Sequence, residues 1–173
     1  MKYDNAIHII ITGGTIDSHY DGSKDTVIPN DTSVIPHFVE SLKLYQGKFE
    51  FTTVCMKDSR QLNESDRATI LKTIQESPYT KVLITQGTYT LADTARFIKG
   101  SMEGTDKVVV LTASMIPLVG FSPSDAPFNL GFAIAKLDDL PAGVYVCVNG
   151  HVFNPDEVVK DVPEGRFTSL FNR

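Results

Sequence analysis

The chain has 173 residues, of which 42% are hydrophobic and 21% are charged, and its formal net charge is −5. This length predicts one domain that can bury a substantial core, and the composition is ordinary for a soluble globular protein. No apolar run is long enough to span a bilayer and no basic cluster occurs, so neither a membrane nor nucleic acid is an expected partner.

The chain opens on a segment with the composition of a strand. Residues 1–11, M-K-Y-D-N-A-I-H-I-I-I, contain an acid and lack a small-residue cleavage site. They therefore indicate a first strand and not an export signal. We expect a cytoplasmic protein for this reason.

Five short runs rich in β-branched residues are separated by segments with helical spacing, which predicts alternating strands and helices. The predicted strands are Ala6–Thr12, Phe49–Met56, Lys81–Thr85, Val108–Thr112 and Gly143–Val148. Four helices are predicted between them. The first covers about residues 34–42 behind capping residues 31–33, the second begins after Asn63, the third runs from Leu91 to Lys99 and stops at Gly100, and the nearly all-apolar fourth begins near Ser124 or Asp125.

This alternation predicts an α/β fold, with a three-layer, Rossmann- or flavodoxin-like, mostly parallel sheet that has helices on both faces. All crossovers are expected to be right-handed. Functional loops are expected at the carboxyl ends of the strands, in the crevice where the strand order reverses. Residues 22–26, G-S-K-D-T, are the predicted mobile loop, and the tail after Asp161 is expected to be a short strand or an arm that packs on a neighbour.

The cysteines and histidines give no support for a metal site. Cys55 and Cys147 fall inside predicted strands and are interpreted as buried reduced thiols, although a disulfide between them stays open. The chain has no C-x-x-C, and its four histidines form no H-x-x-x-H pair. We therefore predict neither a metal nor another cofactor.

Small and hydroxyl-bearing residues collect at the predicted strand ends. Glycine there lets a ligand approach the main chain, and free backbone N–H groups suit a carboxylate or a developing oxyanion. Threonine is stiff at χ1, which suits a fixed nucleophile, and a buried lysine with a lowered pKa is the natural group to activate it. The residues concerned are Gly13, Gly14, Thr15, Asp58, Ser59, Gly87, Thr88, Tyr89, Thr90, Ser114 and, a dozen residues beyond the last strand, Lys160.

Each of these features has a plain structural alternative. The G-G-T turn could be only a strand-to-helix connection, Lys160 a solvated surface lysine, Asp58 and Ser59 turn caps, and Tyr89 an exposed aromatic. Nucleotide binding by the glycine loop is a weaker interpretation, because neither G-x-G-x-x-G nor G-K-[ST] occurs. Only the joint pattern favours a functional site.

The joint pattern resembles the bacterial-type L-asparaginase family, which are threonine-dependent amidohydrolases. The resemblance is carried by six segments that run in order through nearly the whole chain. They are T-G-G-T-I at 12–16, D-S at 58–59, I-T-Q-G-T-Y-T-L-A-D-T-A at 84–95, V-V-V-L-T-A-S-M-I-P at 108–117, S-D-A-P-F-N-L at 124–130, and G-V-Y-V-C-V-N-G at 143–150 with E-V-V-K ending at Lys160.

The resemblance implies a role for each matching residue. Thr15 resembles the nucleophile, Thr88 the second threonine that works with Lys160, and Tyr20 the tyrosine of the loop after the first strand. Ser59 would hold the α-carboxylate, and the Ser114 carbonyl would meet the amide. The backbone of Gly14, Gly87 and Thr88 would line the pocket and the oxyanion hole. The residues expected to bind the substrate are Gly14, Asp58, Ser59, Gly87, Tyr89 and Ser114. Asparagine, or a related small amide, would give aspartate and ammonia through an acyl-enzyme.

Two departures accompany the resemblance. Residues 1–173 match a single N-terminal-type domain without the family's smaller C-terminal domain, although short members exist, and we expect a homo-oligomer in which a neighbouring chain covers the crevice. Tyr89 also stands where the family has an aspartate that binds the substrate's α-ammonium group. The change removes a charge-assisted contact and should leave Lys160 more easily neutral. The alternative is a catalytically impaired relative that binds an amino acid or small amide as a regulatory module.

Overall fold

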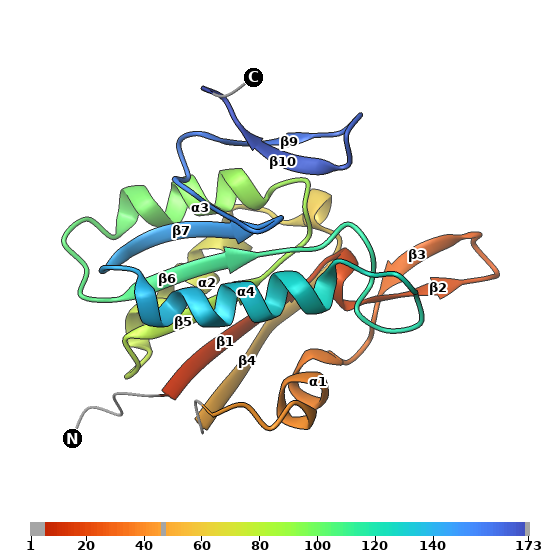
Figure 1. Cartoon of the computed structure of the whole chain (residues 1–173), viewed down its shortest axis with the longest axis horizontal. Coiled ribbons are helices and arrows are strands. Elements are labelled where there is room, and N and C mark those ends of the chain that lie inside the picture. The colour runs from red at the N-terminus through yellow and green to blue at the C-terminus, as the bar shows by residue number, and fades with distance from the viewer. Residues whose placement is uncertain (1–5, 46–47, 172–173) are drawn as a thin grey trace.

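The computed structural model describes residues 6–45 and 48–171. Its main sheet has six strands in the order β4-β1-β5-β6-β7-β8 (Figure 1), of which all but the antiparallel β8 are parallel. The five predicted strands and the three-layer α/β fold are therefore confirmed. The strands are β1 (Ala6–Gly13), β4 (Lys48–Lys57), β5 (Lys81–Thr85), β6 (Val108–Thr112), β7 (Gly143–Val148) and β8 (His151–Phe153).

Two helices cover each face of the sheet. Helices α1 (Ile35–Ser41) and α4 (Ala126–Asp139) pack on one face, and α2 (Glu64–Glu76) and α3 (Leu91–Ser101) on the other (Figure 1). Helix α2 begins as predicted, because the Asn63 side chain accepts the Asp66 N–H at 3.0 Å and Asp66 returns the bond as a capping box. Helix α3 continues through Gly100 to Ser101. The predicted end at Lys99 is therefore two residues early.

The core consists of two apolar layers that share the sheet. All eight residues of β1 are buried. Ile7, Ile9 and Ile11 belong to the layer under α1 and α4, whereas Ile10 belongs to the layer under α2 and α3. A strand buried on both faces is expected to be continuously apolar, which explains the isoleucine run.

The two cysteines are free thiols, as predicted, although only Cys147 is fully buried and Cys55 is half-buried. Burial raises the pKa of the Cys55 thiol to about 11 and that of Cys147 to about 12. Both side chains therefore act as small apolar groups.

One helical connection has the opposite hand from the other three. The steps from β5 to β6 and from β6 to β7 run in the same direction across the sheet, yet α3 and α4 lie on opposite faces (Figure 1). The connections through α1, α2 and α3 are right-handed, so the β6–α4–β7 connection is left-handed, and the prediction of right-handed crossovers throughout is wrong here. The physical reason is the long segment 113–125, which crosses the carboxyl edge of the sheet before α4 begins.

Hydrogen bonds fix this crossing segment in place. The Asp125 carboxylate accepts the backbone N–H groups of Met115 and Ile116 at 2.9 and 3.0 Å. The buried Asn129 side chain donates to the Ala113 carbonyl at 2.9 Å. Leu118 donates its N–H to the carbonyl of Ile16 at 3.1 Å, which ties the segment to the end of β1.

Two short hairpins add to the main sheet. β2 (Ser18–Asp21) pairs with β3 (Thr26–Pro29), so residues 22–25 of the predicted loop form the turn of a hairpin and Thr26 begins its second strand. β9 (Val158–Asp161) pairs with β10 (Arg166–Ser169), which confirms a short strand in the tail. Figure 1 shows the two hairpins apart from one another, beyond the main sheet. Four-residue strands are too short to give a clear alternation, which is why the sequence did not predict the pairs.

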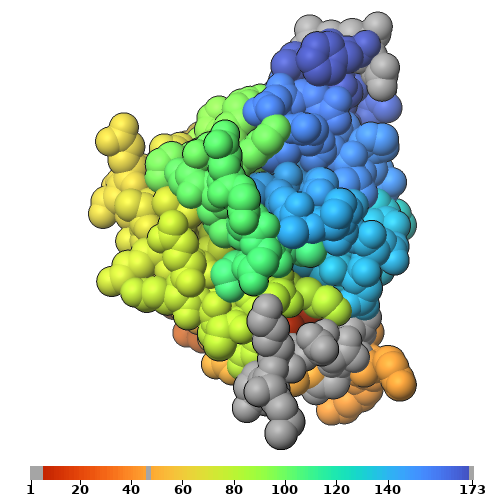
Figure 2. Space-filling view, turned by 90° about the vertical axis from the view of Figure 1, so that its left-hand side faces the viewer, coloured from red at the N-terminus to blue at the C-terminus, as the bar shows by residue number. Residues whose placement is uncertain are grey.

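The amino-terminal ends of the parallel strands lie at the other edge of the sheet. Figure 2 faces this edge, where the turns that precede β5, β6 and β7 form the surface. In the described residues, no helix is both long and apolar enough to cross a membrane.

The ends of β1 and β5 touch through two glycines. A Cβ built on Gly14 would lie 2.1 Å from the nitrogen and 2.3 Å from the Cα of Gly87, and Gly14 has a φ of +80°. Any side chain at this position would therefore meet backbone, in a conformation that L-residues avoid. On the other side, a Cβ on Gly87 would lie 3.1 Å from the Gly14 Cα and 2.8 Å from the Ser59 side chain, so this position is also closely packed.

We predict that Gly14→Ala lowers the free energy of unfolding by about 3 kcal/mol or more, because it combines overpacking with an unfavourable φ. Urea unfolding followed by circular dichroism measures this. The matched control is Gly131→Ala in α4, where nothing lies within 4 Å of the new Cβ. This control should be neutral or more stable by about 0.5–1 kcal/mol. Equal effects of the two substitutions would contradict the packing argument.

Candidate active site

The strand order reverses between β1 and β5. The chain passes from β1 to β4 on one side and then returns to β5 on the other. The carboxyl ends of these two strands therefore flank the crevice in which open α/β sheets hold their ligands. The Gly14–Gly87 contact lies at this point, where the sequence analysis expects the functional loops.

Ser59 is held against the end of β5 by its side chain and its backbone. A Cβ on Gly87 would lie 2.8 Å from the Ser59 Oγ. The Ser59 hydroxyl accepts the Tyr89 N–H at 3.1 Å, and its carbonyl accepts the Thr90 hydroxyl at 2.9 Å. Since Ser59 Oγ is the acceptor of this bond, its own proton is available to a ligand.

Lys160 and Thr88 form a hydrogen-bonded pair. The Lys160 Nζ donates to the Thr88 Oγ1 at 2.7 Å, although 72 positions separate them in the chain. Burial lowers the pKa of Lys160, the Arg60 charge lowers it further, and Asp58 acts in the opposite direction. This agrees with the expectation that Lys160 is more easily neutral.

The β9–β10 hairpin places Lys160 at the site. Lys160 lies opposite Phe167 in this hairpin, and Phe167 is buried in the core under α3. The Phe167 N–H donates to the Asn149 side chain at 2.8 Å, and Arg96 of α3 donates to the Val158 carbonyl at 3.0 Å. The lysine backbone is therefore anchored to both α3 and the turn after β7.

Tyr89 connects this pair to the neighbouring pocket. Its ring centroid lies 4.0 Å from the Lys160 Nζ and 4.9 Å from the Arg60 Cζ, so two cations contact one aromatic ring. The side chain is 55% exposed, and it also lines the pocket. A phenol ring therefore contacts the lysine, with no carboxylate hydrogen-bonded to that lysine in the described part of the chain.

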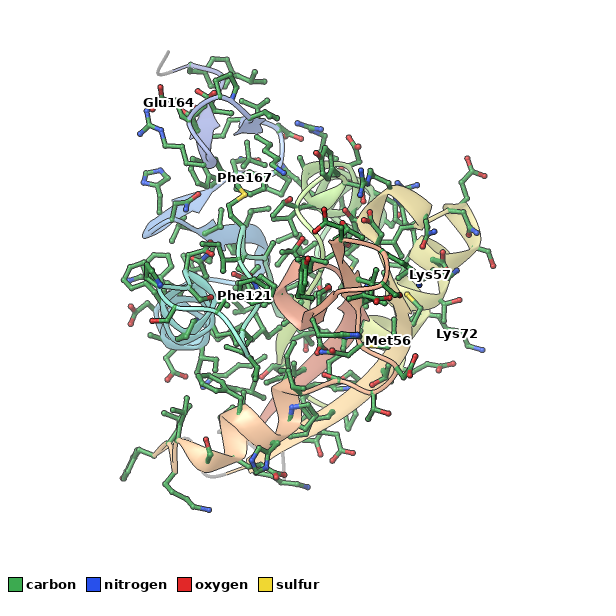
Figure 3. All side chains as sticks on the ribbon, turned by 90° about the vertical axis from the view of Figure 1, so that its right-hand side faces the viewer. Met56, Lys57, Lys72, Phe121, Glu164 and Phe167 are labelled. Carbon is green, nitrogen blue, oxygen red and sulfur yellow. The ribbon has the colours of Figure 1, made fainter. Side chains whose placement is uncertain are left out.

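The pocket has a volume of about 590 Å³ and contains both polar and apolar groups. The crossing segment 113–125 supplies much of its wall. In Figure 3, which faces this side of the molecule, Phe121 of that segment and Met56 of β4 lie to either side of the β2–β3 hairpin. The pocket is lined by Thr15, Thr26, Val27, Asp58, Ser59, Arg60, Tyr89, Met115, Ile116, Pro117, Phe121, Ser122 and Pro123.

The structure brings most of the predicted site residues together. Thr15, Asp58, Ser59 and Tyr89 line the pocket, and the Thr88–Lys160 pair adjoins it through Tyr89. Ser114 is fully buried, and its hydroxyl donates to the Ile116 carbonyl at 2.6 Å.

Two predicted residues have other contacts. The Tyr20 hydroxyl donates to Asp25 at 2.6 Å across the β2–β3 hairpin; the residue is 52% exposed and is not among those that line the pocket. The Gly14 N–H donates to the Lys57 carbonyl at 2.8 Å. It is therefore already engaged and is not free to stabilise an oxyanion.

Sequence reasoning missed Arg60 and the apolar wall. Arg60 follows Asp58 and Ser59 directly in K-D-S-R, so its position at a strand end was a usable signal. The sequence contains no such signal for the wall residues Val27, Ile116 and Phe121. They reach the pocket through a hairpin and a left-handed connection, which the alternation of strands and helices does not predict. Among the described residues, no group of three or more His, Cys, Asp or Glu could hold a metal ion.

Solved structures of L-asparaginases have the same fold as this chain. The thermostable L-asparaginase from Thermococcus kodakarensis is 26% identical with a TM-score of 0.78, over 95% of this chain and 51% of that one. A probable cytoplasmic L-asparaginase from Campylobacter jejuni is 26% identical with a TM-score of 0.76, over 94% and 52%. L-asparaginase I from Vibrio cholerae is 24% identical with a TM-score of 0.76, over 95% and 51%, and shows the fold alone.

The chain spans about half the length of these solved chains. A search of curated protein sequences gave no match. The family model for the asparaginase N-terminal domain, however, matches residues 6–167, which is nearly the whole chain. The chain therefore belongs to the asparaginase family through its N-terminal domain.

Proposed function

We propose that this domain is an amidohydrolase that releases ammonia from L-asparagine or a related small amide. The observation that carries the proposal is the 2.7 Å hydrogen bond between Lys160 and Thr88 beside a pocket lined by Thr15. A hydroxyl is a weak nucleophile until a base removes its proton, and a lysine with a lowered pKa is such a base. The L-asparaginase relatives support the same chemistry.

In the proposed reaction, the Thr15 oxygen attacks the amide carbon. The C–N bond then breaks, and the nitrogen leaves as ammonia with the proton taken from Thr15. Water adds to the Thr15 ester, the C–O bond breaks, and the acid is released with the Thr15 hydroxyl restored. Neutral Lys160 accepts a proton through Thr88 during these steps, and the Ser59 hydroxyl donates to the substrate carboxylate.

A second candidate is a non-catalytic module that binds an amino acid or small amide. Tyr89 favours it, because the ring contacts Lys160 at 4.0 Å where the resemblance implies an aspartate. Ammonia release distinguishes the two candidates. The homo-oligomer expected from the sequence stays a prediction.

We predict that Thr15→Ala abolishes ammonia release by purified protein, and that Thr88→Ala lowers kcat by about 100-fold or more with little change in KM. A coupled ammonia assay measures both. Thr26→Ala, which removes a pocket hydroxyl outside the proposed relay, is the control and should keep most activity. Activity that survives Thr15→Ala would show that Thr15 is not the nucleophile.

Tyr89→Asp should tighten the binding of asparagine. The new carboxylate would offer a charge-assisted hydrogen bond to the α-ammonium group, worth about 1.5–3 kcal/mol, or roughly 10-fold or more in KM. Tyr89→Asn is the matched control, because asparagine has the shape of aspartate without its charge. An unchanged or higher KM in Tyr89→Asp would reject this assignment.

The pH dependence of kcat tests the charge state of Lys160. If neutral Lys160 is the base, kcat rises as pH increases through the pKa of Lys160. Arg60→Gln removes a cation that lowers this pKa and frees Asp58, which raises it, so the rise in kcat should move to higher pH. A rise that stays in place, or that moves to lower pH, would contradict this role.

A further inference from the structure

The charges that line the pocket are already paired with each other. Asp58 and Arg60 are the charged residues in the lining of the pocket, within the described ranges. Arg60 donates to both Asp58 oxygens, at 3.0 Å from Nε and 2.7 Å from Nη2, and its backbone N–H adds a third bond at 2.8 Å. The Arg60 guanidinium accordingly lowers the pKa of Asp58. A substrate ammonium group would therefore meet no free carboxylate in this lining.

The other groups that contact Tyr89 beside the pocket also carry no negative charge. Lys160 makes a hydrogen bond to Thr88 and no ion pair within residues 6–45 and 48–171, and its Nζ contacts the Tyr89 ring. Arg60 contacts the same ring. Neither group supplies a negative charge for a ligand ammonium, because Asp58 balances the Arg60 charge and Lys160 is neutral when it acts as the proposed base.

The pocket also offers more apolar surface and more volume than a small polar amino acid uses. Its volume of about 590 Å³ falls within the range that holds drug-sized ligands. The crossing segment contributes the largest part of the apolar wall. The wall consists of Val27, Met115, Ile116, Pro117, Phe121 and Pro123.

We infer that the pocket takes ω-amides of amino acids whose α-nitrogen is acylated. Such a ligand carries a carboxylate for the Ser59 hydroxyl, a side-chain amide for Thr15, and an apolar acyl group for the wall, but no ammonium group. The inference rests on the proposed function for its chemistry. The C–N bond that breaks is that of the side-chain amide, ammonia leaves, and water supplies the oxygen of the new carboxylate while the acyl group stays attached.

Turnover is measured as ammonia release from L-asparagine, N-acetyl-L-asparagine and N-butanoyl-L-asparagine with the full chain. The expected kcat/KM is at least about 10-fold higher for N-acetyl-L-asparagine than for L-asparagine, the effect of one charged contact. The two further methylenes of the butanoyl group should add several-fold, and Phe121→Ala should remove most of that gain. A higher or equal kcat/KM for L-asparagine would overturn the inference.

Binding to the Thr15→Ala variant separates this inference from the proposed function. Calorimetry should give a Kd for N-acetyl-L-asparagine at least about 10-fold below that for L-asparagine. If the Thr15→Ala variant shows this preference while the unsubstituted protein releases ammonia from none of the amides, the amidohydrolase is rejected and the inference is supported. Free asparagine that binds as tightly, or no measurable binding of the acylated amide, would overturn the inference whatever the turnover.

Two variants connect the preference to the charge pair. Arg60→Gln frees the Asp58 carboxylate for an ammonium group. The Kd for L-asparagine divided by the Kd for N-acetyl-L-asparagine should therefore fall by about 10-fold. Lys72→Gln is the matched control, since it removes a cation from α2 that is 71% exposed and points away from the site in Figure 3. It should leave the ratio unchanged. Equal ratios in both variants would contradict the role of Arg60.

Discussion

The contact between the backbones of Gly14 and Gly87 is the constraint on which the site depends. These residues end the two strands at the reversal of strand order, and a single Cβ at Gly14 would come within 2.1 Å of the neighbouring nitrogen. The approach brings Thr15 and Thr88, which follow the two glycines, to the same edge of the sheet. Ser59 lies next to these two strand ends, because it packs directly on Gly87 and accepts the Tyr89 N–H.

The left-handed connection gives this edge its pocket. A right-handed connection would have kept α4 on the face of α3, and the segment after β6 would have had no reason to cross the end of β1. Instead, Leu118 is bonded to Ile16 and Asp125 holds Met115 and Ile116, so an apolar wall lies beside Thr15. The polar groups come from strand ends, and the apolar groups come from the crossing segment.

Most of the sheet and the polar half of the site were predictable from the sequence, since β-branched runs give buried strands and parallel strands expose their carboxyl ends together. The pairing of Lys160 with Thr88 was implied by the resemblance, whereas the hairpin that positions the lysine was not predicted. Three features depend on tertiary structure alone: the hand of the β6–α4–β7 connection, the Asp58–Arg60 pair and the stacking of two cations on Tyr89. Neither propensity nor periodicity encodes these. The role of Tyr20 stays a prediction, since the structure shows only that its bond to Asp25 holds it in the hairpin, outside the pocket lining.

The central claim is that Thr15 forms a covalent ester with the acyl part of an amide. Acid quenching during turnover, followed by peptide mapping with mass spectrometry, tests it directly. The account predicts the mass of the acyl group on the peptide that contains Thr15, and its disappearance as the amide is exhausted. An adduct on another residue, or full turnover with unmodified Thr15 at every quench time, would contradict it.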